Sequence, residues 1–170
     1  MSYNSWIDFD CKKYYLDSKK HGLRLLFDKK YPFEERNLIK KYIAFLRKKY
    51  FFPIRCKIYI RNCSFFLNES GKRIYGKFVN GQKTENLIVY PCIFVAAKSA
   101  IENMDNILLN LTKLLTYYYQ WYFFDDKNRT SRSIEREANY YAFSLLDIYH
   151  DYCRNKSTKD RLDNYSSATQ

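Results

Sequence analysis

Two neighbouring segments decide the fold of this chain: ILLNLTKLLTYYYQWYFF at residues 107–124 and SIEREAN at residues 133–139. Apolar and aromatic side chains recur in the first segment at three- and four-residue spacing, which predicts a helix from about 101 to 124. The second segment predicts the start of a helix over about 133–152, with Ser133 as its cap and two glutamates in its first turn. The sequence therefore predicts two consecutive helices joined by a short loop.

The layout of these two helices resembles the core of zincin-like metallopeptidases. It is most similar to small bacterial and phage proteins that carry the run His-Glu-Leu-Thr-His-Tyr-Xaa-Gln-Trp. Residues 113–121 of this chain read KLLTYYYQW, so the five positions of the HExxH motif hold Lys113, Leu114, Leu115, Thr116 and Tyr117. The resemblance covers roughly residues 34–152 and is most specific over 106–146. It implies that a third ligand position lies in the Glu-Arg-Glu-Ala segment of the following helix.

The motif positions have lost the groups that zinc chemistry requires. A zincin site needs two imidazoles four residues apart and a glutamate that acts as general base. The ammonium of Lys113 repels a divalent cation, Leu114 transfers no proton, and the neutral Tyr117 is a poor zinc ligand. The two histidines of the chain, His21 and His150, lie far from the motif. We therefore expect a pseudoenzyme with no catalytic residue, no metal and no cofactor.

The same positions define a candidate binding site, called here the remnant cleft. Side chains three and four residues apart on a helix are neighbours, so the polar and apolar positions around Lys113 are predicted to share one face. Under the resemblance, Glu135 is the first choice for the third ligand position and Glu137 the second. We expect Lys113 to form a salt bridge with one of these glutamates, so that an ammonium replaces the metal. The alternative is that Lys113 and Tyr117 are ordinary surface or boundary residues. The predicted remnant cleft comprises Asn110, Lys113, Leu114, Tyr117, Glu135 and Glu137.

The preceding part of the chain predicts one helix followed by a small sheet. Residues 34–50 have the apolar periodicity of an amphipathic helix. Its predicted solvated face carries Lys40, Lys41, Arg47, Lys48 and Lys49. Strand patterns follow at 55–60, at 87–90 and at 93–97, with a hairpin over 65–67 and 73–79.

These elements together predict an α+β fold. We expect a single zincin-like domain over residues 1–153, in which a small, mostly antiparallel sheet packs against three to four helices. Residues 1–22 are predicted to form an N-terminal arm, and the polar segment 154–170 to be a disordered tail.

The net charge of +12 is concentrated in the first two-thirds of the chain. Residues 1–60 hold 15 Lys or Arg against 6 Asp or Glu, and residues 61–100 hold 6 against 2, whereas residues 101–170 hold 9 against 10. Such a surface attracts nucleic acid or an acidic protein, or it only keeps the protein in solution. The 18 tyrosines and 13 phenylalanines favour core and boundary packing first, with stacking on bases as the alternative.

We interpret the chain as an inactive metallopeptidase-like protein that acts by binding. Its expected partner is a protein, such as a nuclease or a ribonucleoprotein, and the narrower hypothesis is a phage or mobile-element inhibitor of a bacterial defence nuclease. One alternative is a basic protein that binds nucleic acid through its N-terminal two-thirds, and another is an enzyme of unrecognised chemistry. Five cysteines without a CxxC pair, and no apolar run of about 20 residues, favour the cytoplasm of a bacterial host and no membrane partner.

Overall fold

The computed structural model describes residues 21–83, 87–98, 103–123 and 129–167 of the chain. Its main sheet has the strand order β1-β2-β8-β5, formed by β1 (Leu23–Phe27), β2 (Cys56–Arg61), β8 (Cys92–Ala96) and β5 (Gly76–Val79). Two short antiparallel pairs join β3 (Phe66–Leu67) to β4 (Arg73–Ile74) and β6 (Gln82–Lys83) to β7 (Ile88–Val89). The helices of the described residues are α1 (Phe33–Lys49), α2 (Met104–Phe123) and α3 (Ser131–Ser167). The predicted arm over 1–22 lies almost wholly outside the described residues.

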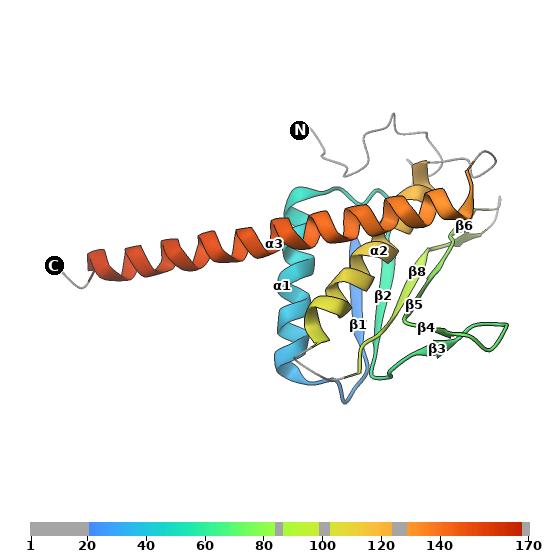
Figure 1. Cartoon of the computed structure of the whole chain (residues 1–170), viewed down its shortest axis with the longest axis horizontal. Coiled ribbons are helices and arrows are strands. Elements are labelled where there is room, and N and C mark those ends of the chain that lie inside the picture. Colours follow the sequence, from blue (N-terminus) through green and yellow to red (C-terminus); the bar gives the residue numbers. More distant parts are fainter. Residues whose placement is uncertain (1–20, 84–86, 99–102, 124–128, 168–170) are drawn as a thin grey trace.

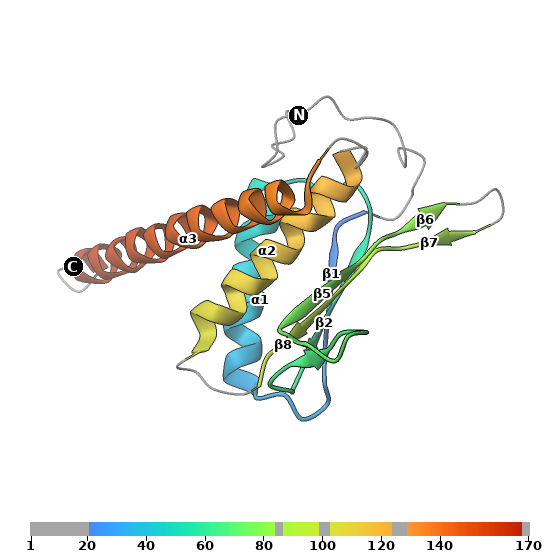
Figure 2. The same ribbon diagram turned by 45° about the vertical axis from the view of Figure 1, so that its right-hand side comes forward.

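The helices lie on one side of the main sheet. Figures 1 and 2 show α1 and α2 against the same sheet face, with α3 crossing over α2. Alternate strand residues point into this layer and are buried, as a half-buried sheet requires. The buried inner face consists of Cys56, Ile58, Ile60, Ile93 and Val95. The core therefore sits between the sheet and the α1–α2 layer.

The predicted α+β class is confirmed, with a correction to the sheet. We expected mostly antiparallel strands, but the main sheet is mixed: β1, β2 and β8 run parallel, and only β5 at the edge is antiparallel. The reason is that α1 connects β1 to β2, and a helical crossover returns the chain in the same direction. The segment LRLLF at 23–27 does not alternate, so its pattern did not indicate strand β1.

Hydroxyl groups of α2 and α1 join α2 to α1 and to the connection between α1 and β2. The hydroxyl of Tyr118 donates to Ile54 O and accepts from Ile54 N, both at 2.9 Å, and Tyr119 donates to Phe51 O. On the other side, the Tyr42 and Thr112 hydroxyls share a hydrogen bond of 2.5 Å between α1 and α2. Because Tyr42, Tyr118 and Tyr119 are fully buried, each of these polar groups needs its partner. These three tyrosines therefore pack in the core.

Aromatic rings also join α1 to α3. Tyr149 lies edge-on to Tyr42, with ring centroids 4.8 Å apart, and Phe45 lies 5.1 Å from both Tyr149 and Tyr152. Aromatic pairs at these separations stabilise a fold beyond the area that they bury. The middle of α3 is therefore anchored on α1.

The last helix is longer than its apolar pattern predicted. It begins at Ser131, where the Thr130 hydroxyl accepts the Ser133 backbone N–H at 3.2 Å, so Thr130 is the cap in place of Ser133. It continues to Ser167 through most of the segment that we expected to be a disordered tail. Figure 1 shows this part extending beyond the rest of the molecule. The spacing of apolar residues identifies only those helical turns that pack against the core. The polar segment that follows contains no proline or glycine, so nothing in its sequence ends the helix.

Candidate binding site between the two motif helices

Two side chains of α2 converge on one carboxylate of α3. Lys113 and Tyr117 lie one helical turn apart and both face the first turns of α3. The Lys113 ammonium forms an ion pair with Glu135 Oε1, and the Tyr117 hydroxyl donates to Glu135 Oε2 at 2.5 Å. The predicted salt bridge is confirmed, and it involves the glutamate that we ranked first. The residues at two motif positions and at the implied third ligand position therefore contact one another.

Electrostatics fixes the protonation of this cluster. Hydrogen bonds from Lys113 and then Tyr117 hold the pKa of Glu135 below its ordinary value, so it is a carboxylate at neutral pH. Burial, followed by the hydrogen bond to Glu135, raises the pKa of Tyr117 and keeps the phenol as a neutral donor. The Glu135 side chain is 52% exposed and that of Lys113 is 26% exposed. Solvent screens such a pair, so it contributes about 1 kcal/mol or less to stability.

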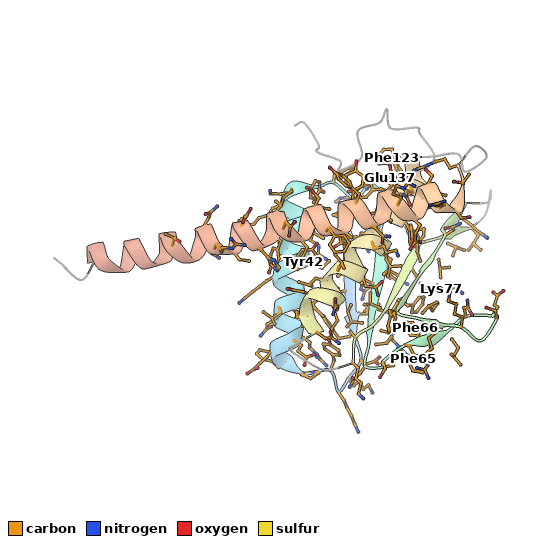
Figure 3. All side chains as sticks on the ribbon, in the orientation of Figure 1. Tyr42, Phe65, Phe66, Lys77, Phe123 and Glu137 are labelled. Carbon is orange, nitrogen blue, oxygen red and sulfur yellow. The ribbon has the colours of Figure 1, made fainter. Side chains whose placement is uncertain are left out.

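Glu137 belongs to a different set of contacts. The buried Gln120 amide donates to Glu137 Oε2 at 2.5 Å and to Ile134 O at 3.0 Å. Arg129 also donates to Glu137 Oε2, at 2.8 Å. Figure 3 shows Glu137 near Phe123, where the end of α2 meets the start of α3. Glu137 therefore ties the two helices together at their junction and does not meet Lys113 or Tyr117.

Leu114 and Asn110 face the sheet instead of α3. Leu114 is buried, and Asn110 donates through its side-chain amide to Tyr75 O at 2.7 Å. A Cβ on Gly76 would lie only 2.5 Å from Leu114 Cδ1 and 2.9 Å from Asn110 Nδ2. The predicted shared face is thus split, with Lys113 and Tyr117 toward α3 and Leu114 and Asn110 toward β5. The glycine in β5 permits this close approach of strand and helix.

A cleft of about 950 Å³ opens beside Lys113, between α2, α3 and the main sheet. Its polar lining includes Ser64, Asn103, Asn106, Asn110, Asn139, Lys98 and Lys113. Two exposed aromatic side chains also line it, namely Tyr75 at 63% exposure and Phe143 at 59%. Among the described residues that line the cleft, none is an aspartate or glutamate. Among the predicted residues, Asn110 and Lys113 line it, whereas Leu114, Tyr117, Glu135 and Glu137 do not.

Most of the residues that line the cleft were not predicted from the sequence. Asn139 and Phe143 follow Glu135 at four-residue steps on α3, so helical spacing alone would have placed them on the same face. Tyr75 carries no such signal, because its position depends on how the edge strand β5 pairs with β8.

The five predicted basic residues of α1 lie away from this cleft. Lys40, Lys41, Arg47, Lys48 and Lys49 are all exposed, as expected for the solvated face of the helix. Two of them have local contacts, since Arg47 donates to Leu23 O and the Lys49 ammonium lies 5.1 Å from the centre of the Phe45 ring. The α1 cations therefore form a surface separate from the Lys113–Glu135 contact.

The residues at these positions do not fit a zinc ion, because the Lys113 ammonium stands where the zincin resemblance implies a ligand and is already bound to the Glu135 carboxylate. Within the described residues, no three His, Cys, Asp or Glu side chains are grouped so that they could hold a metal. None of the described helices is both long and apolar enough to span a bilayer. Comparison of the chain with family models, curated proteins and solved structures finds no match.

Proposed function

We propose that this chain is a catalytically inactive, zincin-like domain that binds a protein partner in the cleft beside Lys113. The observation that carries the proposal is the convergence of Lys113 and Tyr117 on Glu135. Under the zincin resemblance these are the three ligand positions. Their polar groups satisfy one another and are not available to bind a metal or activate water. The neighbouring cleft is therefore the candidate place for a partner to bind.

The lining of the cleft suits a segment of polypeptide. Asparagine side chains both donate and accept hydrogen bonds, as the peptide groups of a bound segment do. Tyr75 and Phe143 offer exposed aromatic surface, which is typical of the residues that dominate binding energy in protein interfaces. The Lys113 ammonium is already paired with Glu135, whereas Lys98 forms no ion pair with a carboxylate of the described residues, so Lys98 favours a segment that carries negative charge.

The narrower form of the proposal concerns the partner. This chain would be a phage or mobile-element protein that inhibits a bacterial defence nuclease, in the manner of an anti-CRISPR protein. It would act in the host cytoplasm by binding the nuclease. The Lys-, Tyr- and Asn-rich composition suits an AT-rich bacterial or phage genome. Addition of the purified chain to a reconstituted defence nuclease would then lower cleavage at stoichiometric concentration.

The binding proposal is tested by affinity capture from bacterial lysate treated with nuclease, comparing two single variants of α3. Phe143→Ala removes an aromatic side chain from the cleft, whereas Tyr140→Ala removes one that is 68% exposed on the same helix but outside the cleft lining. We expect a protein partner captured by the parent chain and by Tyr140→Ala, and a loss of at least about tenfold with Phe143→Ala. Equal capture by both variants, or loss of all capture after nuclease treatment, would contradict the proposal.

A further inference from the structure

The second face of the main sheet is not covered by the described helices. Figure 2 shows α1, α2 and α3 all on the opposite side. Residues that alternate with the buried ones point to this outer face, and in β2 and β8 they are only partly buried. The outer positions of these two strands include Lys57, Tyr59, Cys92 and Phe94.

The strand register gathers aromatic and basic side chains on this face. Tyr59 is paired with Phe94, and their rings stack with centroids 4.9 Å apart and an interplanar angle of 9°. Lys77 of β5 is the partner of Phe94 on its other side, and Figure 3 shows Lys77 on the sheet, far from Tyr42 in the helical layer. In the next row, Arg24 of β1 is the partner of Lys57. Two stacked rings thus lie among three cations.

The charge of the face is uncompensated within the strands. None of the four strands of the main sheet contains an aspartate or glutamate. Arg61 of β2 pairs with Asp28 at 3.0 Å, but no carboxylate of the described residues forms an ion pair with Arg24, Lys57 or Lys77. The row from β1 to β5 spans three strand spacings, or about 14 Å. This is wide enough for a few nucleotides.

We propose that this outer face binds single-stranded nucleic acid. The partly exposed rings of Tyr59 and Phe94 stack with bases, and Arg24, Lys57 and Lys77 bind the phosphates on either side. Unpaired bases stack on aromatic side chains of an open sheet in other single-strand-binding domains, where two or three bases occupy the sheet. A duplex keeps its bases stacked internally and offers such a face only phosphates. This activity is independent of the cleft beside Lys113.

The test uses two triple variants of the full chain that remove the same charge. Arg24→Ala/Lys57→Ala/Lys77→Ala alters the outer face, and Lys40→Ala/Lys41→Ala/Lys48→Ala alters exposed lysines of α1. Binding of fluorescein-labelled 12-mer oligo-dT and oligo-U is measured by anisotropy across a salt series, beside a duplex 12-mer and a polyglutamate peptide. Phe94→Leu and Tyr59→Leu retain apolar bulk without a π face, and circular dichroism verifies folding.

We expect the parent chain to bind the single strands more tightly than the duplex or polyglutamate. The logarithm of affinity should fall with the logarithm of salt at a slope of about −2, because about three phosphates are contacted. The outer-face triple variant should abolish most of this slope, and each leucine variant should weaken binding by about 5- to 100-fold. The α1 triple variant should bind nearly as the parent does.

Several results would overturn the proposal. Equal affinity for duplex and single strand, or equal loss in the two triple variants, would mean that the net charge alone attracts nucleic acid. Tighter binding of polyglutamate would assign the face to an acidic protein. Absence of oligonucleotide binding at low salt, with folding intact, would leave Tyr59 and Phe94 as a packing pair.

Discussion

At the residue scale, Glu135 carries the contact that defines the candidate site. It accepts from both Lys113 and Tyr117, and these hydrogen bonds explain the direction of its pKa shift. A carboxylate whose pKa is lower in the folded chain stabilises that chain at pH values above its ordinary pKa of 4.5. The contribution is lost as pH falls below 4.5 through the folded-state pKa.

Glu135→Gln should therefore lower stability by about 1 kcal/mol or less at pH 7, and the difference from the parent should be smaller at pH 3. Urea unfolding at the two pH values measures this. Glu69→Gln, at an exposed position of the β3–β4 loop, is the control and should have no effect at either pH. A deficit of Glu135→Gln that persists unchanged at pH 3 would show that the ion pair is not its cause.

At the element scale, the approach of β5 to α2 depends on Gly76. A Cβ there would meet Leu114 Cδ1 at 2.5 Å, Asn110 Nδ2 at 2.9 Å and the backbone oxygen of Phe94 at 3.0 Å. We expect Gly76→Ala to destabilise the chain by about 1–3 kcal/mol, because the side chains can shift but the backbone oxygen is held in the sheet. Val79→Ala, on the outer face of the same strand, should cost less. Thermal unfolding compares the two, and an equal cost would contradict this account.

Some contacts between helices could be predicted from the sequence, whereas contacts between strands could not. Lys113 and Glu135 were predicted to meet because the motif resemblance implied a ligand position for each, whereas helical spacing only placed Lys113 and Tyr117 on one face. Tyr59 and Phe94 lie on strands whose parallel pairing depends on a crossover helix and on β1, which has no alternating pattern. The end of α3 was missed for another reason: residues 153–156 are exposed and carry no apolar period. The sequence pattern within one helix or strand predicted that element, but it did not predict the register between strands that are distant in the sequence.

At the scale of the whole molecule, the core is rich in tyrosines that must remain neutral. Burial raises the pKa of Tyr42, Tyr118 and Tyr119 above the ordinary value of 10.0. In the unfolded chain these phenols ionise near pH 10, so above that pH the unfolded state has released protons that the folded state keeps. Stability is thus fully present below pH 10 and decreases as pH rises further.

We expect urea midpoints to be nearly constant from pH 7 to pH 9 and to fall steeply above about pH 10. Tyrosinate absorbance, followed in parallel, should rise in two stages, first from exposed tyrosines and then together with unfolding. Tyr140→Phe, which removes an exposed phenol, should leave the stability profile unchanged. Ionisation of all tyrosines near pH 10 without loss of structure would contradict the buried positions of these side chains.

We propose that Lys113, Tyr117 and Glu135 occupy the positions that the zincin resemblance assigns to three zinc ligands. Zinc binding by Lys113→His/Tyr117→His, measured by calorimetry and compared with the same variant carrying Glu135→Gln, tests it most directly. The account predicts that the two histidines, four residues apart, and Glu135 bind zinc, and that Glu135→Gln weakens the affinity at least about tenfold. A folded double variant that binds no zinc, or whose affinity does not depend on Glu135, would contradict the claim.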